Sequence, residues 1–481
     1  DELFFSFFGF RTFDSCCGKC LCFVPQAQQD ITLQQIPEIW KDLNVPWRLS
    51  LNGNSLEEIT VFPPLKNLTA LSFRYNKITK IADNAFLNLT SLVSLDLSHN
   101  NLTAESFHSN TFQGPYADMI PNPIPLEELD LSFNQIKRLP KDVFHHLKKL
   151  KYLKLSHNDF MDLSTTTAQA LSEIQTLEKL DLSYTKLLRL PDHFFAELGQ
   201  VKRGLLWEHK SRYVDSSIPL HLLLSELDLS GNDFPIVPSE INYAHSLEIL
   251  RMDNNIFGTI YEDSFHKTLE KIHTLSLTNS ETLFRIENGA FGNLSSLQTL
   301  WLSDNVQLTT IYPRAFMNHE NRTLHLKELH LENNKLERLS ESALPWNDIS
   351  SLNLAGNPWN CDCNFEFFAK KVVPLIAKKN YDIAIQIVCA APEELMGYRA
   401  IDVKVQVHEF VCEEQTFNTK KYGYVVVATI VVGILLLVTG TIIFSYVLFR
   451  RTKVHDWIGN NVKYRRTLNE DEDVITSNIH Y

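Results

Sequence analysis

Cysteines are the residues of this chain whose type and spacing best suit chemistry. The stretch CCGKCLC holds Cys16, Cys17, Cys20 and Cys22, and its spacing suits zinc binding, a redox thiol pair or disulfide bridges. The other four are Cys361, Cys363, Cys389 and Cys412, after 338 residues without a cysteine. Clusters at both ends of a long cysteine-free middle favour two disulfide-bonded caps. Zinc binding and redox chemistry remain alternatives for the N-terminal cluster.

Motifs for catalysis or nucleic-acid binding do not appear in the sequence. There is no G-x-S-x-G, H-E-x-x-H or phosphate-binding G-x-x-x-x-G-K-[ST] pattern. Serine, histidine and aspartate recur together, as at Asp96, Ser98 and His99, but on repeat-surface positions that do not build a buried triad. A net charge of −12 without a basic patch argues against a nucleic-acid partner. We therefore expect no enzyme, no cofactor and no metal ion.

A repeat of about 24 residues dominates the middle of the chain, and its copies align on L-x-L-x-x-N, ten of twelve with the Asn. Alternation places both leucines on the buried side of a short strand, so each repeat adds one strand to a parallel sheet. Twelve clear copies end at Asn54, Asn76, Asn100, Asn134, Asn158, Thr185, Asn232, Asn255, Ser280, Asn305, Asn334 and Asn357. A degenerate copy is expected near residues 205–207, which gives about thirteen repeats.

Two further columns of side chains follow the same period. An inward asparagine amide can satisfy backbone groups at a buried bend, and Thr185 and Ser280 can do so only partly. We therefore expect weak points in the asparagine ladder at these two positions. Phenylalanines at a fixed place in the repeat predict a stacked aromatic spine beneath the convex side. They are Phe86, Phe144, Phe195, Phe265, Phe291 and Phe316.

The pattern LxxLxLxxNxLxxLxxxxFxxL resembles the leucine-rich repeats of extracellular proteins, and NPWNCDC at residues 357–363 resembles their C-terminal cap. The resemblance covers about residues 47–412. It implies an α/β solenoid, a horseshoe with a parallel concave sheet and cysteine caps at both ends. It also implies the bridges Cys361–Cys389 and Cys363–Cys412, with Trp359 over the open end of the core. The N-terminal cluster lacks the family's fourth cysteine, so its pairing stays open.

An apolar segment near the C-terminus predicts one transmembrane helix. Residues 424–449 carry no charge, and this run exceeds the roughly 20 residues that a membrane-spanning helix needs. Basic residues follow the segment directly at Arg450 and Arg451, and all glycosylation sequons precede it. The sequons are Asn67, Asn88, Asn101, Asn293 and Asn321. We predict a single-pass type I protein of the plasma membrane with an extracellular N-terminus.

These observations divide the chain into six predicted regions. They are an N-terminal segment and cysteine cap (1–46), the repeats (47–356), a C-terminal cap (357–412), a juxtamembrane segment (413–423), the transmembrane helix (424–449) and a cytoplasmic tail (450–481). Residues 3–10 fit either a signal-peptide remnant or an apolar packed N-terminus. The tail is too short for a catalytic or Toll-type signalling domain, and Tyr464 and Tyr481 are candidate sites for a cytoplasmic adaptor.

A partner would meet the strand residues that face away from the core, because these line one concave surface. The position before the ladder residue is aromatic or imidazole in five early repeats: Tyr75, His99, Phe133, His157 and Tyr184. Arg251 and Trp301, at the central strand position, are secondary candidates. Two interpretations stay open, a binding strip of exposed aromatics or a position that merely tolerates these residues. The irregular stretches 104–125 and 201–222 are further candidates for specificity or for neutral drift.

In layout the chain resembles the insect adhesion proteins Tartan and Capricious. That resemblance implies recognition of an extracellular protein ligand or of a protein on an apposed cell. The alternatives are a co-receptor or decoy in innate immunity, given the relation to Toll-like receptor ectodomains, and a growth-factor co-receptor. The repeat pattern does not separate them, because a fold does not determine a function.

Overall fold

The computed structural model describes residues 10–13, 21–25, 45–117, 120–192, 194–195, 223–403 and 429–451, with backbone only for 10–13, 21–25, 116–117 and 120–121. The chain divides into two units, Asp1–Phe410 and Val411–Tyr481, which we treat separately. Several predictions fall outside the described residues. These are the thiols of the N-terminal cluster, residues 3–9, residues 205–207, Cys412, the juxtamembrane segment and the tail.

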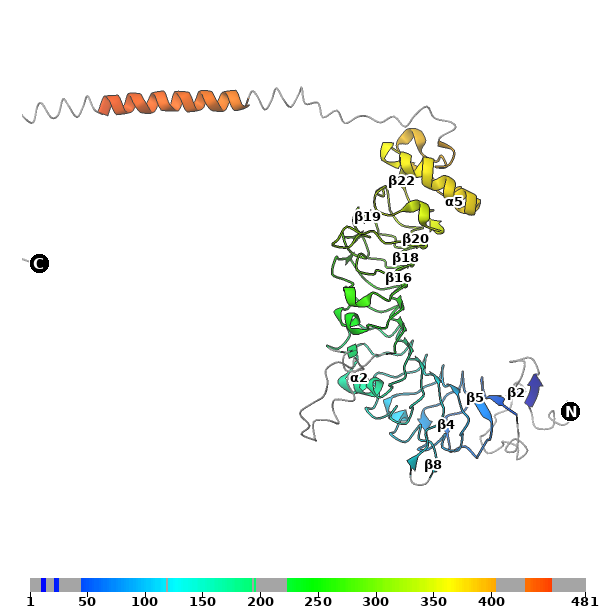
Figure 1. Ribbon diagram of the computed structural model, residues 1–481. Coiled ribbons are helices and arrows are strands. Elements are labelled where there is room, and N and C mark those ends of the chain that lie inside the picture. Colours follow the sequence, from blue (N-terminus) through cyan, green and yellow to red (C-terminus); the bar gives the residue numbers. More distant parts are fainter. Residues whose placement is uncertain are drawn as a thin grey trace, which may run out of the picture. The chain divides into compact units, whose positions relative to one another are not determined.

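The first unit is a solenoid whose main element is a sheet of fourteen strands in the described part of the chain (Figure 1). The strands from β3 to β21 pair in parallel, and the first leucine of each L-x-L lies beside that of the next repeat, as Leu95 lies beside Leu71 and Leu129. At the N-terminal end β2 pairs with β3 in parallel and with β1 antiparallel. The predicted parallel-sheet solenoid is confirmed.

The strands of this sheet are short and evenly spaced along the chain. In order they are β1 (Phe10–Phe13), β2 (Leu21–Pro25), β3 (Trp47–Ser50), β5 (Leu68–Ser72), β7 (Ser94–Asp96), β10 (Glu128–Asp130), β11 (Tyr152–Lys154), β12 (Lys179–Asp181), β13 (Glu226–Asp228), β14 (Ile249–Arg251), β16 (Thr274–Ser276), β18 (Thr299–Trp301), β20 (Glu328–His330) and β21 (Ser351–Asn353). Since β12 pairs directly with β13, no strand of a thirteenth repeat lies between them in the sheet.

The return segments between these strands carry shorter elements. Three small parallel or antiparallel sheets are formed by β4 (Glu58–Ile59) with β6 (Lys80–Ile81), by β15 (Thr259–Ile260), β17 (Arg285–Ile286) and β19 (Thr310–Ile311), and by β8 (Tyr116–Ala117) with β9 (Ile120–Pro121). The helix α2 (Thr165–Ser172) also lies there and begins after Ser164, whose hydroxyl accepts a hydrogen bond from the Thr167 amide.

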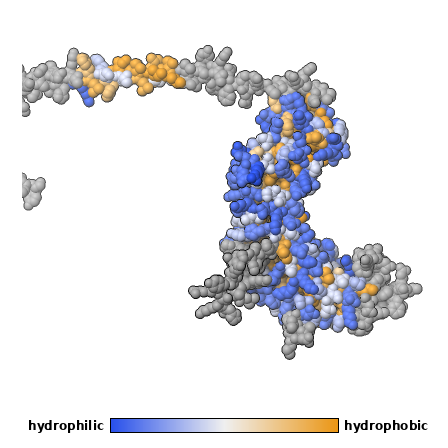
Figure 2. Space-filling model, viewed as in Figure 1, coloured by the Kyte–Doolittle hydropathy of each residue, from blue (hydrophilic) through white to orange (hydrophobic). Residues whose placement is uncertain are grey.

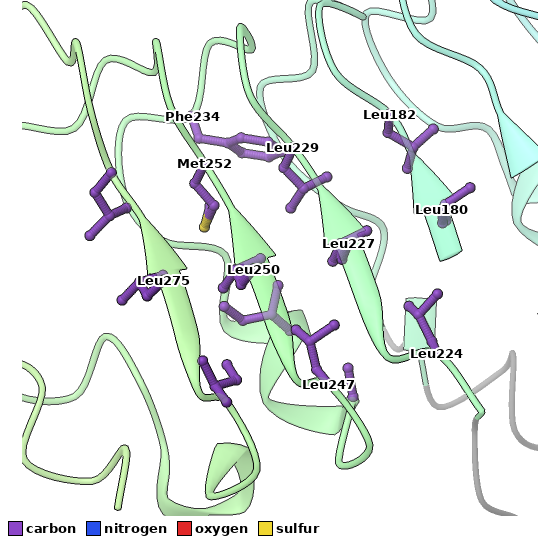
Figure 3. Packing of buried hydrophobic residues seen from close by; sticks show 14 of the residues in the cluster. Leu180, Leu182, Leu224, Leu227, Leu229, Phe234, Leu247, Leu250, Met252 and Leu275 are labelled. Atoms are coloured by element: carbon purple, nitrogen blue, oxygen red, sulfur yellow. The ribbon is translucent and has the colours of Figure 1, made fainter. Parts of the chain in front are cut away.

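The core lies between the sheet and the return segments. Leu227 and Leu229 project to the same side of the sheet as Leu250 and Met252 of the next repeat (Figure 3). All four side chains are fully buried, and burying such a side chain contributes about 1.5–3 kcal/mol. No repeat could bury these residues alone, because each strand covers the leucines of its neighbours.

The asparagine ladder forms as predicted. The Asn100 amide donates to the carbonyls of Phe73 and Leu97, each at 3.0 Å, while its Oδ1 accepts from the Ile78 amide at 3.1 Å. The two positions expected to be weak differ from each other. The Thr185 hydroxyl donates to the Leu182 carbonyl, but the buried Ser280 Oγ has no hydrogen-bond partner within the described residues.

The aromatic spine is present in two segments of stacked, buried rings. Ring centroids are 5.7 Å apart between Phe291 and Phe316, and 6.0 Å apart between Phe265 and Phe291. In the early repeats Phe112 lies 5.9 Å from Phe86 and 6.4 Å from Phe144. Phe112 belongs to the irregular stretch 104–125, so that stretch supplies core structure as well as loop. Phe195 is buried too and packs edge-on against Phe194.

A compact cap closes the C-terminal end of the solenoid. It comprises β22 (Trp359–Asn360), β23 (Cys389–Ala391), α5 (Val373–Lys379) and α6 (Tyr381–Ala384). Cys361 is bonded to Cys389, the pairing that the family resemblance implies. Cys363 is also disulfide-bonded. Trp359 is fully buried, and its indole N–H donates to the Leu354 carbonyl at 2.9 Å.

The described part of the second unit is one helix, Thr429–Arg451, with a mean hydropathy of 2.5 in its most apolar window. Its surface is hydrophobic along most of its length (Figure 2). A helix of 23 residues rises about 35 Å, which is enough to cross the hydrocarbon core of a bilayer.

Candidate binding surface

A column of five stacked rings lies along one edge of the main sheet. Neighbouring ring centroids are 4.2 Å apart for Tyr75 and His99, 4.0 Å for His99 and Phe133, 4.0 Å for Phe133 and His157, and 4.6 Å for His157 and Tyr184. The last three pairs are within 12° of parallel. We call these five side chains the ring ladder.

The backbone at each rung explains where the rings lie. Every rung has a positive φ, between 54° and 59°, and comes three residues after the last residue of its strand. The rings therefore stand at the turn that directly follows each strand. Strand spacing of about 4.8 Å then brings successive rings to stacking distance. The same turn in later repeats has Gly231 and Asn254, residue types that adopt positive φ readily.

Each end of the ring ladder has a specific contact. The Arg74 guanidinium lies 4.8 Å from the Tyr75 ring centroid, and its Nη2 is 3.3 Å from His99 Nε2. At the other end the Tyr184 hydroxyl accepts from Asn254 Nδ2 at 3.2 Å. A Cβ on Gly231 would lie 2.3 Å from Tyr184 Cδ1, so the Tyr184 ring occupies the space of the next rung. The column ends there for that reason.

The ring ladder combines exposed aromatic surface with neutral imidazoles. Tyr75, Phe133 and Tyr184 are 55%, 41% and 45% exposed. Partial burial lowers the pKa of His99, and the Arg74 charge lowers it further. Burial also lowers the pKa of His157. Both histidines are therefore uncharged at neutral pH, and the column presents five adjacent neutral rings.

A row of carboxylates lies on the sheet face beside the ring ladder. It consists of Asp96, Asp130, Asp181 and Asp228, the last residues of four strands, and we call it the aspartate row. A serine two residues later fixes each one. Asp96 Oδ1, for example, accepts from the Ser98 amide at 2.9 Å and from the Ser98 hydroxyl at 2.6 Å. Sequence reasoning missed this row, although the recurring LDLS pattern is its signal.

The aspartate row lines a hollow of about 540 Å³ on the sheet face between β7 and β14. Cations also line it. Lys154 Nζ lies 3.6 Å from Asp130, while Lys179 and Arg251 lie 2.6 Å and 3.9 Å from Glu226. Burial raises the pKa of Asp228, and the charge of the neighbouring Asp181 raises it further.

The remaining predicted site residues lie elsewhere. Arg251 and Trp301 are the last residues of β14 and β18 and face the same side of the sheet as the aspartate row, apart from the ring ladder. Trp301 stacks on His330 at 3.7 Å. The Ser98 hydroxyl donates to Asp96, and the His99 ring stacks between Tyr75 and Phe133. Asp96, Ser98 and His99 therefore do not form a nucleophile–base arrangement.

The five sequon asparagines differ in how free their side chains are. Asn101 and Asn321 are exposed, and Asn67 is half-buried. Asn88 and Asn293 are half-buried, and their Nδ2 atoms donate to the carbonyls of Phe62 and Phe265 at 2.8 Å and 3.0 Å. Two sequon asparagines, Asn101 and Asn321, are therefore exposed, whereas the side chains of Asn88 and Asn293 are hydrogen-bonded to the backbone of the preceding return segment.

Comparison of the sequence with known proteins finds leucine-rich-repeat proteins. A leucine rich repeat family model matches residues 48–102, 124–187 and 270–322, and a second such model matches residues 91–114. Rabbit (Oryctolagus cuniculus) lumican is 35% identical over 165 residues, which cover 30% of this chain and 79% of that protein. Human lumican is 32% identical over 183 residues, or 32% of this chain, and the chain spans half its length.

One solved structure shares the fold at low sequence identity. The mouse RP105/MD-1 complex contains a chain that is 20% identical and superposes with a TM-score of 0.54. The match covers 79% of this chain and 61% of that one. At this identity the likeness concerns the solenoid fold alone.

Proposed function

Because the chain belongs to the leucine-rich-repeat family, we propose that it is a membrane-anchored recognition protein whose solenoid binds a protein partner outside the cell. The ring ladder carries this proposal. Five adjacent aromatic rings, four of them exposed and His99 half-buried, form a contiguous strip, and such strips serve as anchors in protein interfaces. The rigid solenoid holds the strip in place before binding, which lowers the entropic cost of association.

The proposed anchor is the helix Thr429–Arg451. We propose a type I orientation in the plasma membrane, because sequons and cysteines precede this helix and basic residues follow it. An epitope tag at the N-terminus should then be stained on intact cells, and a C-terminal tag only after permeabilisation. The reverse pattern would refute the orientation without affecting the proposal of protein binding.

We propose adhesion as the specific role. Expressing cells mixed with non-expressing cells should cluster or sort apart, and the variant Y75A/F133A/Y184A should lose this behaviour at equal surface expression. A matched control is Y261A/F284A/Y381A, which removes two tyrosines and one phenylalanine that are 45%, 57% and 44% exposed outside the ring ladder. The control should sort like the unchanged protein.

Proximity labelling on the cell surface identifies the partner without a prior guess. A labelled protein that the ring-ladder variant loses and the control variant keeps would support the proposal. Recovery of the same proteins with both variants would refute the ring ladder as the binding surface. A partner that acts in immune sensing or growth-factor signalling would replace adhesion by the co-receptor role.

A further inference from the structure

We propose that the ring ladder and the aspartate row form one composite surface that binds a basic protein segment, one with a row of apolar side chains beside a row of cationic ones. This inference rests on the proposed function and specifies the chemistry of the partner. Such a segment would lay its apolar row along the rings and its lysine or arginine row along the carboxylates.

The two rows are neighbours that run in parallel across the solenoid. On three turns the rung lies three residues beyond the aspartate, as His99 lies beyond Asp96, Phe133 beyond Asp130 and Tyr184 beyond Asp181. On the turn of His157 the same strand position is Lys154, which lies in register between Asp130 and Asp181. They are close enough to interact, because the carboxylates of Asp96 and Asp130 both act on the charge of His99, and that of Asp181 acts on His157. A partner that covers one row therefore meets the other.

Stacking determines what the ring ladder can bind. The faces of the inner rungs are covered, since His99, Phe133 and His157 each have a ring about 4 Å away on both sides. A sugar or nucleotide base that must stack on a ring face finds no free face there. The exposed ring edges instead form a wall of aromatic carbons that also carries imidazole nitrogens and tyrosine hydroxyls, and its carbon surface suits aliphatic side chains of a protein.

The charges beside this wall select a cationic partner. Six carboxylates and three cations line the hollow, a formal excess of three negative charges. The cations Lys179 and Arg251 lie at Glu226 and Lys154 lies at Asp130. Within the parts of the solenoid that the structure describes, Asp181 and Asp228 have no cationic side chain within 4.0 Å of their carboxylate oxygens.

These two carboxylates face each other on adjacent strands, in register across β12 and β13. Like charges so placed repel, and Asp228 is half-buried, so its charged form is costly even with the Arg251 charge nearby. A lysine or arginine brought by a partner would offset both costs. An acidic partner would increase them. The complementary partner for this surface is therefore basic.

The test measures peptide binding to the full chain in phosphatidylcholine nanodiscs, with empty nanodiscs as background. The probes are three 14-residue helical peptides, each with two adjacent rows of side chains at the same spacing. The rows are leucine and lysine in the first peptide, leucine and glutamate in the second, and serine and lysine in the third. The leucine–lysine peptide should bind most tightly. D181N/D228N should raise its Kd about tenfold or more, because asparagine keeps the Oδ1 acceptor for Ser183 and Ser230 and removes only the charge. The ring-ladder variant Y75A/F133A/Y184A should raise the Kd similarly.

Each remaining outcome would overturn the inference. Tighter binding of the leucine–glutamate peptide would reverse the predicted charge of the partner. If the serine–lysine peptide bound as tightly as the leucine–lysine peptide, the rings would not contribute to binding. If D181N/D228N left the Kd of the leucine–lysine peptide unchanged, the carboxylates would not contribute to binding. Cell sorting that needs the rings but survives D181N/D228N would refute this inference and leave the proposed function standing.

Discussion

At the residue scale, buried asparagines connect consecutive turns through hydrogen bonds that no apolar residue can replace. Asn158 donates to the carbonyls of Leu131 and Leu155, both at 2.9 Å, and accepts from the Ile136 amide at 2.9 Å. One side chain thus satisfies three backbone groups on two consecutive turns. Ser280 occupies the equivalent place in its own repeat and is buried, but its hydroxyl has no partner in the described structure.

The pair N158A and S280A tests this difference. N158A should lower the free energy of unfolding by about 2–3 kcal/mol, because it leaves buried backbone groups without partners. S280A should be neutral or slightly stabilising, because it removes an unsatisfied hydroxyl. Denaturant unfolding of the purified full chain measures both. Similar destabilisation by the two substitutions would contradict the assigned role of the ladder.

The two histidines of the ring ladder predict how stability depends on pH. Their pKa values in the folded protein are lowered, so below about pH 6.5 the unfolded chain binds more protons than the folded one. Stability should therefore be complete above that pH and fall as the pH decreases through it. The groups that face His99 are Arg74, Tyr75, Phe133, Asp96, Asp130 and His157, and those that face His157 are Phe133, Tyr184 and Asp181.

The variant H99F/H157F should show a flatter loss of stability between pH 7.5 and 5 than the unchanged protein, while the stack of rings is retained. His146, whose pKa burial also lowers, is present in both proteins and cancels in the comparison. Thermal unfolding at several pH values measures the effect. Parallel pH curves for the two proteins would show that the histidines of the ring ladder do not contribute.

Sequon occupancy should follow the local environment of each asparagine. We predict high glycan occupancy at Asn101 and Asn321, which are exposed, and lower occupancy at Asn88 and Asn293, whose amides donate to backbone carbonyls. Mass spectrometry of glycopeptides from surface-expressed protein measures this. N88Q should destabilise the chain more than N101Q, since only Asn88 bonds the preceding return segment. Equal occupancy at all four sites would contradict the prediction.

At the element scale, the solenoid has two columns of aromatic rings with opposite roles. The spine lies in the core, where Phe112 is fully buried and stacks between Phe86 and Phe144. The ring ladder stands at the turns after the strands, with its ring edges exposed. The same residue type, phenylalanine, therefore stabilises the fold in one column and supplies contact surface in the other.

The variants F112A and F133A separate these roles with one type of substitution. F112A should cost about 3–5 kcal/mol of stability, because it leaves a cavity in a packed core. F133A should cost less than about 1.5 kcal/mol, since its ring is partly exposed, yet it should weaken partner binding. Unfolding and cell-sorting assays on both variants provide the two measurements. A larger stability loss in F133A than in F112A would contradict the assignment.

Sequence periodicity predicts elements better than it predicts their surfaces. Strand positions and register follow from L-x-L, because one slip would turn every leucine to solvent. Phe112 escaped the prediction, since it lies fifteen residues after Leu97 rather than thirteen or fourteen. The rings were predicted as a set, but their position at the turn after each strand was not, because positive φ angles leave no mark in the periodicity. The aspartate row was missed because each aspartate was considered with its own turn only.

At the scale of the whole molecule, the solenoid is a linear array in which each turn contacts mainly the turns before and after it. An uncapped end would expose the buried leucines of the last strand, β21, to water. The C-terminal cap covers that end with Trp359, and the bridge Cys361–Cys389 joins its two short strands β22 and β23. The two cysteines are 28 residues apart in the sequence. A disulfide bridge that closes such a loop contributes about 2–4 kcal/mol to the free energy of unfolding.

Removing this bridge should therefore affect one end of the molecule rather than all of it. In C361S/C389S we expect amide hydrogen exchange to accelerate in β20, β21 and the cap, while β7 to β12 keep their protection. The ring ladder lies on β5 to β12 and their turns, so partner binding through Tyr75 to Tyr184 should survive in the variant. Full-chain exchange measured by mass spectrometry resolves the two regions. Uniform acceleration across all strands would mean that the solenoid unfolds as one cooperative unit, and the ring ladder would then depend on a cap many turns away.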